Sequence, residues 1–158
     1  MRIEHIVVDT SPLICLLKSG LLDLLPKLFT EIIVPDKVYQ EVTAKGAIDF
    51  PTIKHLKQIG NINISESVAS WDLGKGESSV LSFALKNSKF YAVIDDREAR
   101  RCAASLGCHH IGTVGIILLA KRRGFVSSVK DSLNKLQAAG LWLSDSFIKE
   151  VCLKVRED

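Results

Sequence analysis

The chain has 158 residues, of which 47% are hydrophobic and 25% are charged. This composition excludes a disordered or low-complexity chain and predicts a single folded globular domain over residues 1–158. The net charge of +3 permits nucleic acid as a partner without requiring it.

Nothing in the sequence suggests export or membrane insertion. No apolar run is long enough to cross a membrane, and no signal peptide precedes the first predicted strand. The four cysteines lack the spacing of a disulfide scaffold; they are Cys15, Cys102, Cys108 and Cys152. We therefore expect a cytoplasmic protein with reduced thiols.

The first half of the chain alternates short apolar strands with helices. Residues 3–9 form an apolar, β-branched run typical of a buried parallel strand. Thr10 or Ser11 is expected to cap the following helix, which has Pro12 in its first turn and ends near Gly20. The next expected elements are a helix over 22–29, a strand over 31–34, a helix over 35–45, a helix over 51–59 and an edge strand over 61–65.

The second half continues this alternation and then becomes helical. Residues 140–143 are short enough to be either a strand or a loop. The other expected elements are a helix over 77–87, a strand over 91–95, a helix over 97–106, a strand over 109–112, and helices over 113–123, 126–139 and 144–155. The order predicts a three-layer α/β/α domain with a central, mostly parallel sheet.

Aspartates follow two of these strands. Asp9 ends the first strand, and the Asp95–Asp96 pair stands at the end of the strand over 91–95. Because the carboxyl ends of parallel strands meet at one edge of a sheet, where open α/β folds place their sites, these acids can converge. Glu77 at a helix start and Glu41 on a helix beside the sheet can face the same edge.

Four carboxylates in one pocket would repel each other unless a cation lay between them. Hard oxygen ligands of this kind suit Mg²⁺ or Mn²⁺. Each acid also has a plain structural explanation. Asp9 and Glu77 could stabilise helix N-termini, one of the Asp95–Asp96 pair could cap a helix, and Glu41 could be a solvated helix residue.

Basic residues form two groups that could contact the phosphates of a nucleic acid. The first group follows the second strand–aspartate junction, and the second ends a later helix. Both could instead be solvated helix faces. The residues are Arg97, Arg100 and Arg101 in the first group and Lys121, Arg122 and Arg123 in the second.

Four segments resemble the acidic motifs of PIN domains: VDTSPLI at 8–14, VPDKVYQEV at 34–42, LGKGESSV at 73–80 and VIDDREAR at 93–100. Their order and spacing look closest to a prokaryotic PIN-like branch of unknown function, described as predicted nucleic-acid-binding proteins and related to VapC-type toxin ribonucleases. HIGTVG at 110–115 is similar to the next strand–helix junction of that branch. The resemblance covers nearly the whole chain.

The resemblance implies an Mg²⁺- or Mn²⁺-dependent ribonuclease acting on single-stranded RNA, and it allows a toxin with an antitoxin partner. By position, the catalytic and metal-binding acids are Asp9, Glu41, Glu77 and Asp96, with Asp95 as the alternative to Asp96. The small polar residues that help to position water or phosphate in the family correspond to Thr10, Ser11 and Thr113.

The chain departs from the family pattern in two places. Ser79 stands where members often have a second acid, which leaves open a module that binds nucleic acid or protein without cutting. The core pattern ends near residue 125, so residues 126–158 form an extension that could make a dimer surface or cover a helix.

The two tryptophans, Trp71 and Trp142, could stack on bases or could simply pack in the fold.

Overall fold

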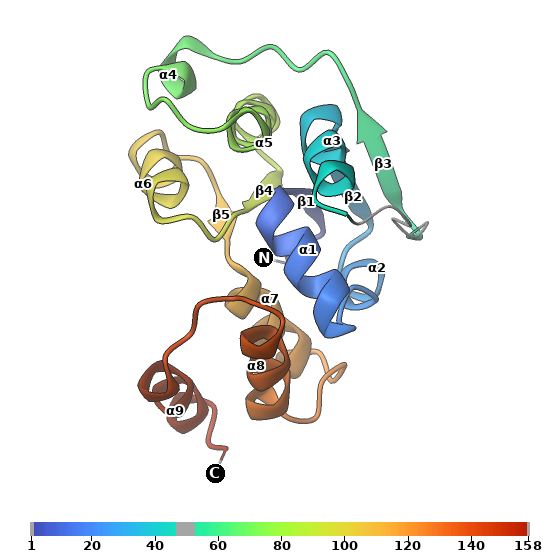
Figure 1. Cartoon of the computed structure of the whole chain (residues 1–158), viewed down its shortest axis with the longest axis vertical. Helices are drawn as coiled ribbons and strands as arrows, with labels where there is room; N and C mark the ends of the chain where they lie inside the picture. Colours follow the sequence, from blue (N-terminus) through green and yellow to red (C-terminus); the bar gives the residue numbers. More distant parts are fainter. Residues whose placement is uncertain (1, 47–52, 158) are drawn as a thin grey trace.

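The computed structural model describes residues 2–46 and 53–157 (Figure 1). At their centre lies a sheet of five parallel strands in the order β3-β2-β1-β4-β5. The strands are β1 (His5–Val8), β2 (Glu31–Pro35), β3 (Leu56–Ile59), β4 (Phe90–Val93) and β5 (His110–Ile111). The expected central parallel sheet is confirmed, and β1 occupies its middle position.

Apolar side chains explain why β1 lies at the centre of the sheet, between β2 and β4. Val7 of β1 pairs with Ile33 of β2, and the two side chains are 0% and 1% exposed. On the other side of β1, Val8 pairs with Val93 of β4. A parallel strand covered on both faces needs an apolar residue at every position, and the runs of Val and Ile meet that need.

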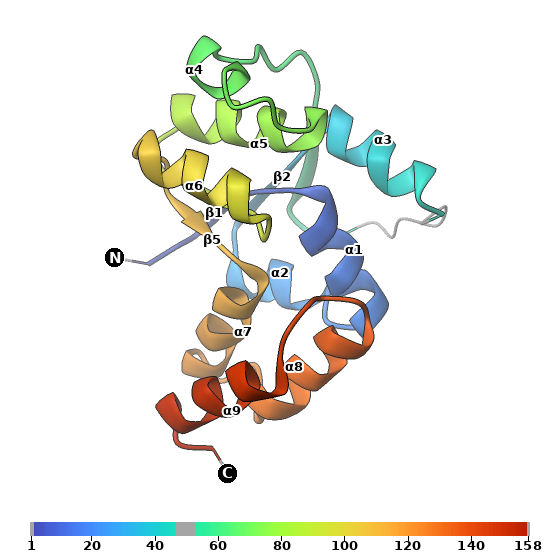
Figure 2. The same ribbon diagram turned by 60° about the vertical axis from the view of Figure 1, so that its left-hand side comes forward.

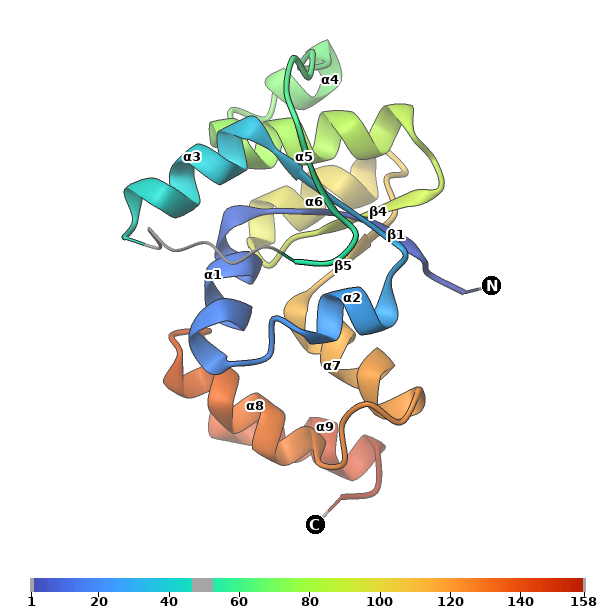
Figure 3. The ribbon, with the colours of Figure 1, turned by 90° about the vertical axis from the view of Figure 1, so that its right-hand side faces the viewer.

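Helices cover both faces of the sheet (Figures 2 and 3). One face carries α4, α5 and α6, and the other carries α1, α2 and α7, with α8 packed on α1 and α7 and α9 outside them. The helix α3 projects from the carboxyl edge and packs against both α1 and α5. The helices are α1 (Thr10–Ser19), α2 (Leu24–Leu28), α3 (Asp36–Ala44), α4 (Glu66–Ala69), α5 (Lys75–Lys86), α6 (Arg97–Ser105), α7 (Thr113–Arg122), α8 (Val129–Ala138) and α9 (Asp145–Lys154).

The expected helix over 51–59 and edge strand over 61–65 are wrong for the residues that the structure describes; residues 51 and 52 lie outside them. Residues 56–59 form β3, which pairs in parallel with β2, and residues 61–65 contain no strand. The apolar residues Ile53, Leu56 and Ile59 are spaced three apart, which imitates a helical face. Pairing with β2 overrides that local pattern, and the short helix α4 then follows where none was expected.

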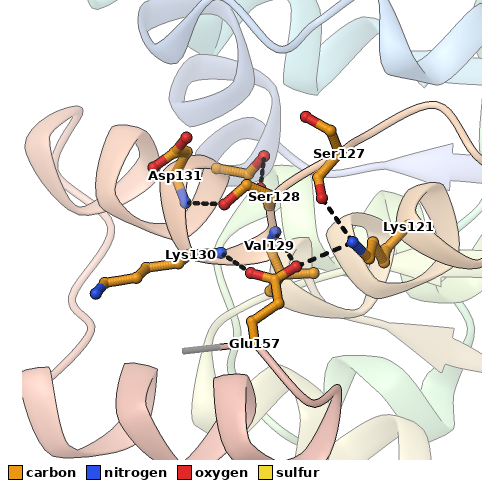
Figure 4. A network of polar contacts seen from close by, with 8 residues as sticks. Lys121, Ser127, Ser128, Val129, Lys130, Asp131 and Glu157 are labelled. Carbon is orange, nitrogen blue, oxygen red and sulfur yellow. Dashed lines mark hydrogen bonds and ion pairs between the residues drawn. The ribbon is translucent and has the colours of Figure 1, made fainter.

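The C-terminal end of the chain returns to the start of α8 (Figure 4). The backbone N–H groups of Val129 and Lys130 donate to the two carboxylate oxygens of Glu157 at 2.8 and 3.0 Å, and Lys121 Nζ lies 3.2 Å from one of them. Burial alone would raise the pKa of Glu157, but these donors outweigh it and lower the pKa below its ordinary value. A negative charge therefore stabilises the N-terminus of α8.

Across residues 2–46 and 53–157, no helix has the length and apolar character needed to cross a membrane.

Candidate active site

Asp9 lies directly after β1, at the carboxyl edge of the sheet, and is 4% exposed. Its backbone N–H donates to the Val93 carbonyl at 3.1 Å, which ties the end of β1 to the end of β4. Asp9 itself occupies the N-cap position of α1 and makes no side-chain capping bond. The expectation that Thr10 or Ser11 caps α1 is therefore wrong, because α1 already begins at Thr10.

The Asp9 carboxylate is poorly satisfied. Within the described part of the chain, its Oδ1 is the one buried side-chain oxygen or nitrogen without a hydrogen-bond partner. The pKa of Asp9 is raised to about 7. Burial is the main cause; the Thr10 N–H opposes the rise, and the negative charges of Glu77, Glu41 and Asp95 add to it. Three other carboxylates therefore act on Asp9 electrostatically.

Glu41 on α3 is held from two sides. Thr10 Oγ1 donates to Glu41 Oε2 at 2.7 Å, and the Gly76 N–H donates to Oε1 at 3.0 Å. A Cβ atom at position 76 would lie 2.8 Å from Glu41 Oε1, closer than real contacts allow. The absence of a side chain at Gly76 therefore lets α5 approach the Glu41 carboxylate.

Glu77 and Asp96 meet between α5 and α6. Burial raises the pKa of Glu77, and the nearby carboxyl of Asp96 raises it further. Glu77 also accepts from the Gly74 N–H at 3.4 Å, and Asp96 accepts from the Ala99 N–H at 3.0 Å as the cap of α6. The structure thus brings Glu77 and Asp96, the third and fourth predicted acids, close together. Asp96 also caps α6.

Asp95 joins the end of β4 to the start of α7. Its two oxygens accept from the Thr113 N–H at 2.8 Å and from Thr113 Oγ1 at 2.5 Å. A Cβ at Gly112 would lie 3.1 Å from Asp95 Oδ1 and 3.6 Å from Arg100 Nη1, so the Arg100 guanidinium reaches the same place. Thr113 is the first residue of α7, and Asp95 holds it through both donors.

The described residues contain no group of three or more His, Cys, Asp or Glu side chains arranged to hold a metal ion as they stand. Most carboxylate oxygens at this edge are directed at protein donors instead, as the contacts of Glu41, Asp95 and Asp96 show. Asp9 Oδ1, in contrast, is buried and has no hydrogen-bond partner. An unpartnered buried carboxylate oxygen beside further carboxylates is a donor set that fits Mg²⁺ or Mn²⁺.

The two basic groups lie in different places. In the first, Arg97 is exposed at the start of α6, Arg100 reaches the carboxylate edge, and Arg101 pairs with Glu98 at 3.0 Å. The second group lies at the other end of α7, in its last turn and at the residue that follows it. Arg122 is exposed there.

The contacts of the second group are structural. Lys121 Nζ donates to the Ser127 carbonyl at 2.6 Å. Arg123 donates to the carbonyls of Leu28 and Ile3 at 2.7 and 3.2 Å, next to the amino ends of β2 and β1. Because these partners lie at the opposite edge of the sheet, the structure does not bring Lys121, Arg122 and Arg123 to the carboxylates.

A cavity of about 370 Å³ opens beside the carboxylates. Ser11, exposed on the first turn of α1, lines it together with Asp95 and Asp96. Sequence reasoning missed the rest of its lining, which comes from α1, from the end of α3 and from the turn after α8. No pattern in the sequence marks these residues, which include Lys45, Ala139, Gly140 and Leu141.

A family model described as a PIN domain matches residues 5–157, a range that includes α8 and α9. No curated protein gives a significant match to the chain, and no solved structure does so either. PIN domains have a nuclease-type fold and typically use divalent metal ions, in keeping with the acids gathered at the carboxyl edge of this parallel sheet. The match over nearly all of its length shows that the chain belongs to the PIN-domain family.

Proposed function

We propose that this protein is an Mg²⁺- or Mn²⁺-dependent nuclease that hydrolyses phosphodiester bonds, with single-stranded RNA as its substrate. The observation that carries the proposal is the buried, unpartnered Oδ1 of Asp9, which lies where three further carboxylates raise the pKa of its carboxyl group. Such an arrangement is costly in the metal-free protein and becomes favourable around a cation.

The proposed ligands are Asp9, Glu41, Glu77 and Asp96, with Asp95 as the alternative to Asp96. A bound divalent ion would supply water of lowered pKa and would stabilise negative charge that develops on the phosphate. Thr10 and the Gly76 N–H fix the orientation of Glu41 before any ligand arrives.

Phosphate binding falls in this proposal to the basic residues nearest the carboxylates. Arg100 reaches the edge of the site, Lys45 lines the adjoining cavity, and Arg97 is exposed at the start of α6; the hydroxyl of Ser11, which also lines the cavity, can add a hydrogen bond. Contacts of this kind neutralise phosphate charge, so binding should weaken as the salt concentration rises.

The decisive experiment is hydrolysis of labelled single-stranded RNA with Mn²⁺ by the wild type and by Asp9→Asn. We expect Asp9→Asn to lower the rate by roughly 100-fold or more, because the central ligand loses its charge. Asp23→Asn is the matched control, since Asp23 is exposed and makes no side-chain capping bond. Equal rates for Asp9→Asn and wild type, or activity that persists in EDTA, would refute the proposal.

A module that binds without cutting is the second candidate. Ser79 is 3% exposed, and its Oγ donates to the Lys75 carbonyl at 2.9 Å. It lines a separate cavity of about 460 Å³ and adds no charge at the position where relatives often carry an acid. Calorimetric titration with Mn²⁺ separates the two candidates, because no binding up to millimolar metal would favour the second.

The resemblance to VapC-type ribonucleases extends the proposal to a cytoplasmic toxin with an antitoxin partner. Expression of the chain with and without the product of a neighbouring small reading frame tests this role through cell growth. We also propose that the whole chain acts as one domain, because α8 packs on α1 and α7. The outer surface of the C-terminal helices α8 and α9 is a candidate homodimer contact, and the mass of the protein in solution would show whether a dimer forms.

A further inference from the structure

The turn between α8 and α9 reaches the candidate active site. The helix α7 leaves the carboxyl edge and runs to the amino edge, and α8 returns in the opposite direction, so that the turn lies at the carboxyl edge near α1 (Figures 2 and 3). Ala139, Gly140 and Leu141 of this turn line the cavity of about 370 Å³ together with Asp95 and Asp96. The C-terminal helices therefore supply one wall of the site.

Trp142 directly follows this wall and is 91% exposed, the highest value among the large hydrophobic side chains of the described residues. Trp71 is, by contrast, half-buried and packed against the core. Folding explains the position of Trp71. It does not explain Trp142, because a large indole left in water adds nothing to the core.

The turn that carries Trp142 is fixed in place. The Leu141 N–H donates to the Leu136 carbonyl at 3.0 Å, and Gly140 adopts the left-handed φ of 110° that lets the chain reverse. Gln137 Nε2 donates to the Leu143 carbonyl at 2.7 Å, which closes the turn on its other side. A residue on such a turn loses little conformational freedom when a ligand binds.

We propose that Trp142 is a stacking platform for a nucleobase of the single strand whose backbone crosses the carboxylates, an inference that rests on the proposed function. The adjoining cavity is within the size range of small-ligand sites, and Lys45 provides a cation for phosphate. Aromatic stacking accepts any base, which suits a nuclease with little sequence preference. The cavity that ends beside Trp142 at Leu141 is lined by two carboxylates and a lysine, a setting that suits a nucleotide better than an apolar protein face.

Tryptophan fluorescence tests the proposal, since the chain has only two tryptophans. Wild type, Trp142→Phe and Trp142→Ala are titrated in EDTA, so that no cleavage occurs, with a single-stranded RNA of about ten nucleotides. We expect the RNA to quench wild-type emission and to leave the emission of Trp142→Phe, which comes from Trp71, unchanged. An abasic strand of the same length keeps the phosphates and should not quench. Trp142→Ala should weaken RNA binding by roughly 5- to 100-fold, and Trp142→Phe should weaken it less.

The outcomes separate this inference from the proposed function. Quenching without any nuclease activity would support the platform and refute the enzyme. Activity with unchanged RNA affinity in Trp142→Ala, or equal quenching by the abasic strand, would refute the platform and leave the enzyme standing. A change in oligomeric state in Trp142→Ala, measured by light scattering, with unchanged RNA affinity would assign Trp142 to a protein contact instead and would overturn the proposal.

Discussion

Thr10 Oγ1 donates to Glu41 Oε2 at 2.7 Å, and this hydrogen bond joins the first residue of α1 to α3. Thr10 is 3% exposed, so its hydroxyl could not bond to bulk water in place of Glu41. The bond therefore sets the position of one proposed ligand, Glu41, from the residue that directly follows another, Asp9.

Replacing Thr10 by Val should separate this positioning effect from the metal site itself. Loss of a buried hydrogen bond to a carboxylate should lower the free energy of unfolding by roughly 1–2 kcal/mol and weaken Mn²⁺ binding. Urea unfolding and calorimetry measure the two effects. Thr10→Ser keeps the hydroxyl and should retain most of both; equal losses in Ser and Val variants would contradict a role for the hydroxyl.

Gly76→Ala should disturb Glu41 selectively. The added Cβ would lie 2.8 Å from Glu41 Oε1, so the carboxylate or the start of α5 must move. We expect a loss of about 1–3 kcal/mol in stability and weaker Mn²⁺ binding. Gly74→Ala is the matched control in the same turn, because its Cβ would meet Glu77 Oε1 at an ordinary 3.5 Å. Similar behaviour of the two variants would contradict the close-approach explanation.

Asp9→Asn should stabilise the metal-free protein above neutral pH. The folded pKa of Asp9, about 7, lies above its ordinary value, so the folded state holds the proton more tightly than the unfolded state. This contribution to stability is fully present below about pH 4 and is lost as pH rises to about 7.

The predicted gain for Asp9→Asn is roughly 2–4 kcal/mol at pH 8 in EDTA, and it should vanish at low pH. Urea unfolding at several pH values measures it, with Asp23→Asn as the control that should follow the wild type. A wild-type stability that does not fall between pH 5 and pH 8 relative to Asp9→Asn would count against the buried charge.

Asp95→Asn and Asp96→Asn should differ in kind. Asp95 accepts two hydrogen bonds from Thr113, so its variant should lose about 1–3 kcal/mol of stability. Asn caps a helix as well as Asp does, so the free energy of unfolding of Asp96→Asn should lie within about 0.5 kcal/mol of the wild-type value. If Asp96 is the metal ligand, its variant should nevertheless bind Mn²⁺ about tenfold more weakly. If only Asp95→Asn binds Mn²⁺ more weakly, then Asp95 and not Asp96 is the ligand.

Glu157→Ala should loosen the C-terminal helices. It removes the acceptor for the Val129 and Lys130 N–H groups, with an expected loss of about 1–2 kcal/mol. Since the folded pKa of Glu157 is lowered, its contribution is present above the ordinary pKa and is lost as the solution becomes more acidic. Glu150→Ala, which removes only an exposed pair with Lys154, should change stability little. Hydrogen exchange at the start of α8 measures the local effect.

The sequence predicted the fold best where a run of apolar residues favours one kind of element, a buried strand. Short apolar runs with β-branched or aromatic residues favour buried strands, so β1 and β4 and the aspartates that follow them were predictable. The edge strand β3 was not, because the spacing of its apolar residues imitates a helix and its identity depends on pairing with β2.

The site was predictable as a set of acids and less so as an arrangement. Motif order pointed to Glu41 and Glu77, but the Thr10 and Gly76 contacts that orient Glu41 depend on how α3 meets α5. The same holds for Gly140 and Leu141. Their approach to Asp95 follows from the path of α7 and α8 through space, and no local pattern encodes that path.

The central position of β1 has a consequence for how the protein is made. Its two neighbours are β2, which follows it closely in the chain, and β4, which begins only at Phe90. A ribosome therefore releases Asp9 long before β4 and the Asp95–Asp96 pair can close against it, and that late closure bridges more than half of the chain. A product that ends before β4 lacks Asp95 and Asp96, so it cannot assemble the carboxylate edge.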